Sequence, residues 1–570
     1  MRELFTRLWE RLPLDFRVLH RQFLLRVIDL ESLSIEADIP RFLGQFAGIL
    51  IMFGLVLGIG VLWTPPPPQL FWGLEQSRIA DVLLVVGLCS VLTWDSTFPD
   101  RRDVMILGPL PMQPRTILSA KVAASGTLLG IAVIALNFGS SLGCSLVLGG
   151  VHGSVVGIVR FFFAYWFTVF AAGAFLYGAV LTIQGFTALL LPRRMFLRVS
   201  ALLQLAAFGF FLGARFLPPT LSTPAEILAP ANRMLLAGSP TLWFFALLNQ
   251  LNGSLPRDLQ WLALRAWVAL LIVATGAVAS LLLSYLRTMK KTVEEPDLVP
   301  GARGFHWTPR FGNSLQSAIV LFCFRSILRS RQHRLALAFY WSIVLAVALS
   351  WARMAITTPP EPIGDDFLMS TFLMMCFAVL GLRSLFALPI SLHANWMLRV
   401  TQLRPTKHYI AATRRCLLLF GVAPIWAIVA ALTFHFRPWQ PAAEHLAFLP
   451  VLGWVLVELS LIKFDRVPFT CSYMPGKTNI QAIFWGFLFI FLTVGLALGI
   501  YEHDALEHTG QYALMMILSA ATITALWSFN RAHAKTAELY FEEIPEELLT
   551  KLGIANIQLT RNGPGESAAK

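Results

Sequence analysis

The residues that could do chemistry in this 570-residue chain are few, and none has the spacing that a catalytic site requires. The nearest approach to a phosphate-binding loop is Gly476-Lys477-Thr478. Such a loop needs a glycine five residues before that of the Gly-Lys pair, where this chain has Cys471. A zinc-protease helix needs His-Glu followed by His, but Glu502-His503 and Glu507-His508 have the reverse order. We therefore predict no enzyme activity, cofactor or metal site, and no ATP hydrolysis by the chain itself.

Two charged residues fall within long apolar runs. Glu458 lies in VLVELSLIKF and Arg383 lies in FAVLGLRSLFALP, five and six residues from one end of their runs. An unpaired charge near the middle of a membrane costs about 2.5–3.5 kcal/mol on insertion scales. One hypothesis is that Arg383 and Glu458 pair or face a polar cavity. The alternative is that each side chain extends to the nearer membrane surface.

A third candidate is the polar, proline-rich stretch WDSTFPDRRDVMILGPLPMQPRTILSAK, from Trp94 to Lys121. It places charges of both signs beside a short apolar segment whose prolines lower the entropy lost on binding. A solvated turn has the same composition, but the combination favours a surface on which a soluble partner docks. The residues assigned to this surface are Asp100, Arg101, Arg102, Asp103, Pro109, Leu110, Pro111, Arg115 and Lys121.

The composition is that of an all-α, polytopic membrane protein. The chain is 56% hydrophobic and 14% charged, whereas soluble domains average about 45–50% and about 25%. The net charge of +13 could indicate nucleic-acid binding. We do not predict such a partner, because the cations lie in short loops between apolar runs, where they set topology and contact anionic lipid. None of the six cysteines lies in a predicted outer loop, so we expect no disulfide framework, and none forms a C-x-x-C pair, so we expect no thiolate zinc site.

Twelve apolar runs are long enough to cross a bilayer of about 30 Å. Cations gather in every second connection and are sparse in the others, where Arg78 and Arg215 are placed. The positive-inside rule then puts both termini in the cytoplasm. The predicted spans are 43–63, 79–94, 122–146, 161–190, 198–218 and 262–286, then 336–356, 367–388, 414–433, 446–464, 480–500 and 512–529.

These spans form two six-helix halves, 43–286 and 318–530, joined by a cytoplasmic linker at 287–317. Region 1–42 holds an Arg-rich amphipathic helix between Phe16 and Leu33. We predict that this helix lies in the membrane interface, the alternative being a helix packed on a cytoplasmic loop. A similar helix is expected at about 315–333, before the second half. The halves therefore have the order expected of a parallel duplication.

The loop after the second span of each half has a common spacing. Leu110 precedes Lys121 by eleven residues, as Leu403 precedes Arg414, and Ile117 corresponds to Ile410. We therefore predict a second docking region in the second half. Its residues are Leu403, Arg404, Pro405, Lys407 and Arg414.

Two further segments differ from the spans. The stretch near 231–253 is hydrophobic but too short and broken to cross, so we predict a re-entrant or interfacial element on the outer face. Its counterpart in the second half, 501–511, is much shorter. The region 531–570 is expected to be a cytoplasmic tail with a short amphipathic helix.

The order of amphipathic helix, two spans and FPDRRDVMILGPLPMQPRTILSAK resembles the membrane permeases of the ABC-2 type. It is most similar to duplicated, twelve-span bacterial forms, and FRSILRSRQHRLALAF at the start of the second half shares the resemblance. The resemblance implies a permease of the bacterial cytoplasmic membrane that binds a separate ABC ATPase subunit, in two copies. ATP would be used by that partner, which would contact Asp100 to Lys121 and Leu403 to Arg415. The second half has LRPTKHY where the first has LPMQPRT, so equal coupling of the halves is not implied.

The main alternative is a secondary transporter with two six-span bundles, like the major-facilitator class. That class shares the span count, the orientation and a long central inner loop. It usually has a glycine-led Asp-Arg-Gly-Arg-type loop after the second span, and Asp100-Arg101-Arg102-Asp103 lacks the glycines. A membrane-embedded enzyme or scaffold is a third alternative, disfavoured because no catalytic cluster is present in the sequence.

Overall fold

The computed structural model describes residues 12–28, 39–94, 105–107, 109–152, 155–216, 221, 223–294, 309–357, 364–390, 395, 400, 406–436, 439–471 and 480–541. Within these ranges the chain is helical apart from its connections, and they contain an isolated β-bridge but no strand. The prediction of an all-α protein is confirmed for the described residues.

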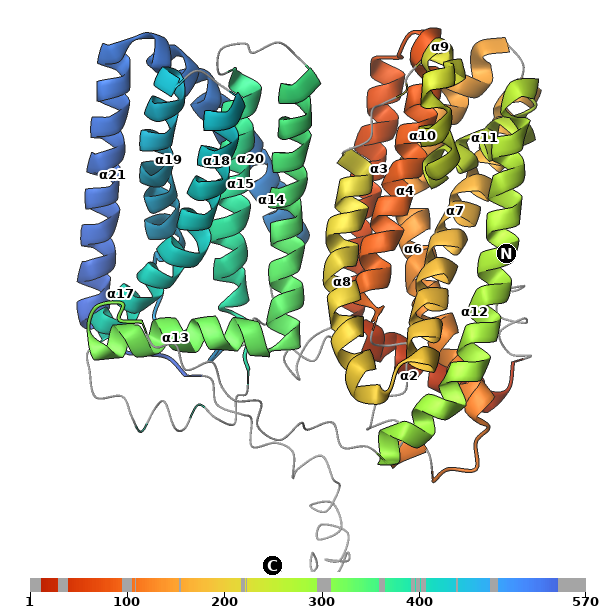
Figure 1. Cartoon of the computed structure of the whole chain (residues 1–570), viewed down its shortest axis with the longest axis horizontal. Coiled ribbons are helices and arrows are strands. Elements are labelled where there is room, and N and C mark those ends of the chain that lie inside the picture. Colours follow the sequence, from red (N-terminus) through yellow and green to blue (C-terminus); the bar gives the residue numbers. More distant parts are fainter. Residues whose placement is uncertain are drawn as a thin grey trace, which may run out of the picture.

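The first half of the chain forms a bundle of long helices (Figure 1). Each contains one of the predicted apolar runs, except α2, which is the expected amphipathic helix. The run predicted at 79–94 begins earlier, at Phe71. The helices are α2 Leu14–Ile28, α3 Ile39–Trp63, α4 Phe71–Leu92, α6 Pro114–Leu148, α7 Val155–Leu190, α8 Arg193–Phe216 and α12 Gln260–Glu294.

The second half forms another bundle, again with an amphipathic helix at one end. A π-helical turn at Leu418–Val422 joins α17 to α18, so these two helices form one long apolar element. The helices are α13 Ser314–Arg329, α14 Arg331–Thr357, α15 Asp365–Leu385, α17 Thr406–Leu417, α18 Ala423–Phe436, α19 Trp439–Ser460, α20 Ile480–Glu507 and α21 Thr509–Thr536.

Nine helical elements of the described residues are long and apolar enough to cross a membrane, or ten if one bent pair counts as a span. Length and hydropathy of this kind indicate a multi-pass membrane protein. Three further long helices, α4, α8 and α20, lie outside this set. The helix α4 carries Glu75, Arg78 and Asp81, and the apolar part of α8 spans Leu202–Phe216.

The two bundles have similar internal packing. In each, the second long helix is central: α4 contacts α6, α7 and α8, and α15 contacts α17, α18, α19 and α20. The fourth helix packs on the sixth in both bundles, as α7 on α12 and α19 on α21. The bundles meet where α14 packs on α8 and α20 packs on α3. Since the first helix of each half meets the fifth of the other, the contact has the reciprocity of a pseudo-twofold axis.

The contact of α3 with α6 depends on glycines four residues apart in each helix. A Cβ atom on Gly54 or Gly58 would lie 2.1 Å or 2.3 Å from a carbonyl oxygen of α6. A Cβ atom on Gly139 or Gly143 would lie 2.5 Å or 2.4 Å from the backbone of α3. Small residues at this spacing allow close approach of membrane helices. The sequence analysis did not use this pattern.

The segment predicted to be re-entrant consists of two short helices, α10 Arg233–Gly238 and α11 Pro240–Asn252. The element Pro230–Gly238 and the helix α11 meet at an angle of 97°. The α11 side chains Phe244, Phe245 and Leu247 are fully buried, and α11 packs on α4, α7 and α12. This bent pair, with α11 buried in the bundle, has the shape of a re-entrant element. In the second half, His508 alone separates α20 from α21.

Some predicted boundaries need correction or lie outside the described residues. The linker predicted at 287–317 is shorter, because α12 continues to Glu294 and α13 begins at Ser314. The tail predicted from 531 begins inside α21, which ends at Thr536. Residues 1–11, 29–38 and the tail helix beyond 541 are outside the described ranges.

Candidate functional site

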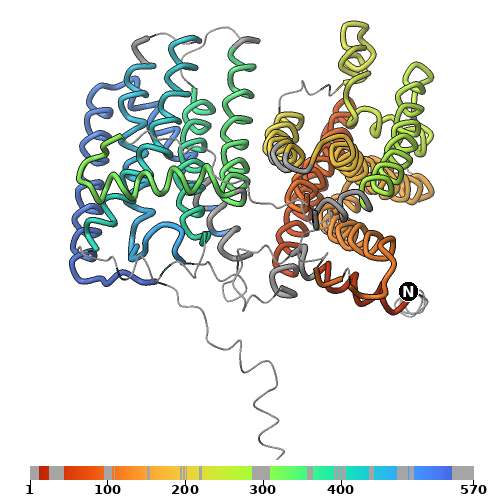
Figure 2. The backbone as a smooth tube through the Cα atoms, turned by 60° about the horizontal axis from the view of Figure 1, so that its bottom comes forward, coloured from red at the N-terminus to blue at the C-terminus, as the bar shows by residue number. Residues whose placement is uncertain are grey.

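The described part of the predicted docking surface lies at the end of the molecule where α2 and α13 are found, which we term the α2/α13 end (Figure 2). Asp100, Arg101, Arg102 and Asp103 are outside the described residues. The segment from Met105 to Arg115, here the docking segment, is described except for residue 108. It contains one helical turn at 105–107, and the Leu110 amide donates to the Leu107 carbonyl at 3.2 Å.

The docking segment presents large apolar side chains to its surroundings. Met105 is 62% exposed, Ile106 is 66% exposed and Leu110 is 47% exposed. Pro109 and Pro111 are exposed beside them. Apolar groups gathered on one turn are typical of surfaces that another molecule covers.

The other side of the docking segment is held by a hydrophobic cluster. Leu107 and Met112 pack against buried residues of α2 and α6, among them Phe23 and Ile117. Pro114 occupies the first turn of α6, where the missing N–H of proline costs no helical hydrogen bond. The docking segment therefore combines an anchored base with an exposed apolar face.

Two predicted docking residues behave differently from each other. Arg115, in the first turn of α6, is exposed. Lys121 is only 3% exposed, and its Nζ lies 5.2 Å from the centroid of the Phe23 ring. Lys121 is therefore not a loop residue but holds α2 on α6 by a cation–π contact. Nearby, His20 Nε2 lies 3.1 Å from Thr127 Oγ1, and burial lowers the pKa of His20.

The second predicted docking region is described only in part. Leu403, Arg404 and Pro405 are outside the described residues. Lys407 is exposed at the start of α17. Arg414 points into the bundle instead, with a side chain that is 15% exposed, so its assignment to a docking surface is wrong.

Arg414 forms an ion pair with Glu458, whose side chain is completely buried. Arg414 Nε lies 2.5 Å from Glu458 Oε1, and Arg414 Nη2 donates to Oε2 at 3.1 Å. Asn530 Nδ2 also donates to Oε2, at 2.9 Å, and Trp454 Nε1 donates to Oε1 at 3.2 Å. The carboxylate therefore joins α17, α19 and α21.

Arg383 does not form the pair with Glu458 that one hypothesis predicted, because Glu458 pairs with Arg414 instead. Arg383 Nε donates to the Ser460 carbonyl at 3.1 Å, and its guanidinium lies 4.5 Å from the centroid of the Phe464 ring. Arg383 points toward the α2/α13 end of its bundle, whereas Glu458 points toward α17 and α21. Arg383 and Glu458 lie at similar distances from the ends of their helices, but their side chains point toward different neighbours.

The amphipathic helices hold corresponding positions in the two bundles. The helix α2 packs on the start of α6, and α13 packs on α17. Ile117 and Ile410, paired by the sequence spacing, are 2% and 3% exposed. In the second bundle Arg415 Nη1 donates to Gln316 Oε1 at 2.6 Å and also to the Phe311 carbonyl. A cation near the start of the third long helix thus contacts the amphipathic helix region in both halves.

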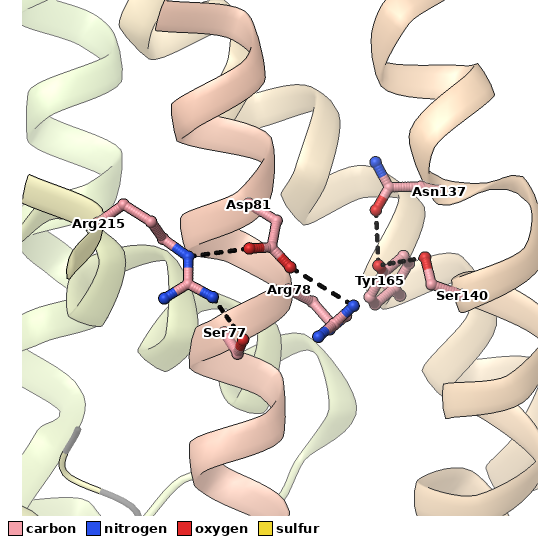
Figure 3. A network of polar contacts seen from close by, with 7 residues as sticks. All are labelled: Ser77, Arg78, Asp81, Asn137, Ser140, Tyr165 and Arg215. Atoms are coloured by element: carbon pink, nitrogen blue, oxygen red, sulfur yellow. Dashed lines mark hydrogen bonds and ion pairs between the residues drawn. The ribbon is translucent and has the colours of Figure 1, made fainter. Parts of the chain in front are cut away.

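The sequence analysis missed a charged network in the first bundle (Figure 3). Asp81 Oδ1 accepts a hydrogen bond from Arg215 Nε at 2.9 Å, and Asp81 Oδ2 lies 3.4 Å from Arg78 Nη1. Arg215 Nη2 also donates to Ser77 Oγ at 3.2 Å. Arg215 comes from α8 and the other three residues from α4, so the network ties these helices together.

Two further buried contacts extend this polar region. Glu75, one turn before Arg78 on α4, accepts a hydrogen bond from Asn249 Nδ2 of α11 at 2.6 Å. Tyr165 of α7 donates to Asn137 Oδ1 of α6 at 2.6 Å. Glu75, Arg78 and Asp81 recur every third residue, a spacing that places them on one face of a helix. This signal was available in the sequence, but the predicted span began after Arg78.

A buried acid–base pair lies at the opposite end of the second bundle. His445 Nδ1 lies 2.6 Å from Glu502 Oε1, and the two side chains are 1% and 3% exposed. The pair connects α19 with α20. The other ring nitrogen of His445, Nε2, has no hydrogen-bond partner among the described residues.

The described residues contain no group of three or more His, Cys, Asp or Glu residues that could hold a metal ion. No protein-family model, no curated protein and no solved structure matches the chain.

Proposed function

We propose that this chain is the permease subunit of an ABC-2 type exporter, powered by a separate ATPase that binds at the α2/α13 end. The observation that carries the proposal is the docking segment. It presents Met105, Ile106 and Leu110 outward while the α2–α6 cluster fixes its base. A partner that transmits force needs such a surface, because a loosely attached loop would absorb the movement.

The proposed topology has twelve spans, with both termini in the cytoplasm. The nine helical elements that satisfy length and hydropathy are joined by α4, α8 and α20, each of which coincides with a predicted apolar run. Of the three ionisable side chains of α4, Glu75 and Asp81 contact other helices and Arg78 pairs with Asp81 on α4 itself, which supports a membrane position for this helix. The cation-rich connections then place the α2/α13 end in the cytoplasm.

The proposed route for the exported substrate lies between the two halves. The reciprocal contacts of α14 with α8 and of α20 with α3 support two equivalent halves that move against each other. Parallel repeats related by an axis along the membrane normal are one known design of transporters. The longer segment α9 Pro224–Leu228 to α11 makes the first half different at its outer end.

The proposal is tested by placing charge on the docking segment. In the double variant Ile106→Asp with Leu110→Asp, we expect the ATPase to dissociate while the permease remains folded in the membrane. Loss of an apolar anchor at the centre of an interface costs about 2 kcal/mol or more, or roughly 30-fold in affinity. The measurement is the amount of ATPase that co-purifies with each variant in mild detergent.

The matched control is Met234→Asp, which adds a carboxylate at a side chain that is 89% exposed in the first bundle's α10. This variant should retain the ATPase at the wild-type level. Equal retention of the ATPase by the double variant and by this control would remove the docking segment from the proposal.

A specific observation favours a second candidate, a proton-coupled secondary transporter. Ionisable pairs inside the bundles, Glu458 with Arg414 and Glu502 with His445, are the kind of residues that carry protons through membrane transporters. The two candidates differ in what drives transport. A secondary transporter responds to a proton gradient without any ATPase, whereas the proposed permease does not.

A further inference from the structure

A cavity of 660 Å³ lies at the α2/α13 end of the second bundle. Its walls come from α14, from the end of α15 and from the connection between α19 and α20. This volume is within the range of about 300–1,000 Å³ that is typical of ligand pockets. The helix α14 also packs on α8, so the cavity lies beside the contact between the two halves.

The lining of the cavity is amphipathic. Three cations, Arg383, Lys463 and Arg466, face a single carboxylate, Asp465. Tyr340 and Ser384 add hydroxyl groups, which are 2.9 Å apart. The remaining walls are mainly apolar, with Ala336, Leu380, Leu385, Phe386, Leu388 and Val467 among them.

Arg383 is positioned to bind an anion. Its Nε donates to the Ser460 carbonyl and its guanidinium lies over the Phe464 ring, which together fix its orientation. The other N–H groups of the guanidinium have no acceptor among the described residues. Planar guanidinium groups of this kind are well suited to phosphate.

One wall of the cavity is the connection between α19 and α20, which contains two residues with positive φ angles. Lys463 and Phe469 have φ angles of 54° and 68°, a region that residues other than glycine occupy rarely. Phe469 donates its amide to the Phe386 carbonyl at 2.9 Å, and its ring lies 4.8 Å from that of His333. Strained backbone held by such contacts is common at binding sites.

We propose that this cavity binds the phosphate head group of an anionic phospholipid from the adjacent leaflet. Arg383 and Lys463 contact the phosphate, Arg466 neutralises the rest of the head group, and the apolar wall receives the start of the acyl chains. The site lies where α14 begins and α15 ends, so it is at the depth of lipid head groups if these helices cross the bilayer. The inference uses that transmembrane placement and does not depend on an ATPase partner.

Native mass spectrometry of the full chain, titrated with phosphatidylglycerol in detergent, tests the proposal. In the double variant Arg383→Gln with Lys463→Gln, the concentration for half-occupancy should rise about tenfold or more, as expected when hydrogen bonds to a charged group are lost. Arg383→Lys, which keeps the charge, should retain part of the binding. The matched control is Arg531→Gln, an exposed cation on α21 outside the cavity, and it should bind like the wild type.

Three outcomes decide the matter. Equal occupancy of the double variant and the Arg531 control overturns the proposal. Competition by inorganic phosphate as strong as that by phosphatidylglycerol assigns the site to a free anion and overturns the lipid. If phosphatidylcholine binds as tightly as phosphatidylglycerol, the cavity does not recognise the negative charge of the lipid, and this also overturns the proposal. If the double variant does not fold, Arg466→Gln supplies the same comparison, because its side chain is 46% exposed and contributes less to packing.

Discussion

At the scale of single residues, the second bundle holds a buried carboxylate, that of Glu458, near the end of α19. Its side chain has no exposure, and donors from Arg414, Asn530 and Trp454 converge on its two oxygens. A buried ion pair contributes little over a well-packed apolar pair, but removal of one partner leaves a charge without compensation. The pair therefore acts mainly by fixing which faces of α17, α19 and α21 meet.

This role predicts a large effect for Glu458→Gln. The variant leaves the Arg414 guanidinium without its carboxylate, and we expect a loss of about 3–5 kcal/mol of stability. Replacement of both partners, Glu458→Leu with Arg414→Met, should recover most of that loss. The measurement is thermal unfolding of the purified protein in detergent.

The control for this experiment is Glu507→Gln, which changes an exposed carboxylate at the end of α20. It should unfold at the wild-type temperature. Rescue of Glu458→Arg by Arg383→Glu, in place of the Arg414 changes, would contradict the assigned pairing.

The sequence predicts the existence of intramembrane charges but not their partners. Hydropathy gives the depth of Arg383 and Glu458 along their helices, whereas pairing depends on how each helix is rotated about its axis. That rotation is set by packing among helices distant in the chain. For the same reason, Lys121 and Arg414 could be placed near the membrane boundary, while their contacts with Phe23 and Glu458 could not be predicted.

At the scale of elements, α3 and α6 of the first bundle approach each other closely. Their glycines let the two backbones approach, because no side chain stands between them. The rest of α3 has several exposed apolar residues, such as Val56 and Ile59. The helix is thus joined to its bundle chiefly along one narrow face.

This geometry predicts different effects on stability for substitutions at two neighbouring glycines, Gly58 and Gly60. A Cβ on Gly58 would lie 2.3 Å from the Gly139 carbonyl oxygen, whereas Gly60 has nothing within 4 Å of its added Cβ. We expect Gly58→Val to separate α3 from α6 and to lower stability by about 1–3 kcal/mol or more, as overpacking does. Gly60→Val should be nearly neutral.

The check is a comparison of thermal unfolding for the two variants, together with a cysteine cross-link between α3 and α6 as a direct measure of their contact. Equal stability of the two variants would show that the close approach of these helices is not required for the fold.

The positions of the helices are predicted well by the sequence, whereas the residues at which they begin and end are predicted less well. The long apolar runs coincide with helices, because the bilayer demands about 20 apolar residues in a row. The helix α4 is an exception, since Glu75 and Arg78 lower the hydropathy of its first half, and the predicted span therefore begins only after Arg78. The charges of α4 are tolerated because Arg215 and Asn249, remote in sequence, contact Asp81 and Glu75.

At the scale of the whole molecule, two similar bundles meet through reciprocal helix contacts. The sequence spacing between Leu110 and Lys121 and between Leu403 and Arg414 pointed to this repetition. The contacts between bundles could not be predicted, because interacting surfaces on lipid-facing helices are as apolar as the lipid-facing surfaces themselves. The sequence predicts which segment forms the docking surface. It does not predict which side chains of that segment are exposed, because this depends on how α2 packs against it.

The asymmetry of the halves also belongs to this scale. The first bundle contains the bent pair of α10 and α11, of which α11 is buried, and the second bundle has a single-residue break at the corresponding place. A similar arrangement of amphipathic helices at the α2/α13 end is therefore combined with different structures at the opposite end. In the proposed function, the difference would act on release of the substrate rather than on coupling to the ATPase.

The central claim is that a separate ATPase drives this chain. The most direct measurement is purification of the chain from its native membrane in mild detergent, followed by identification of the bound proteins and their stoichiometry. We expect an ATPase with its own phosphate-binding loop to co-purify in two copies per chain, and we expect transport by the reconstituted complex to require ATP hydrolysis. A chain that purifies alone and transports its substrate in response to a proton gradient would contradict the claim.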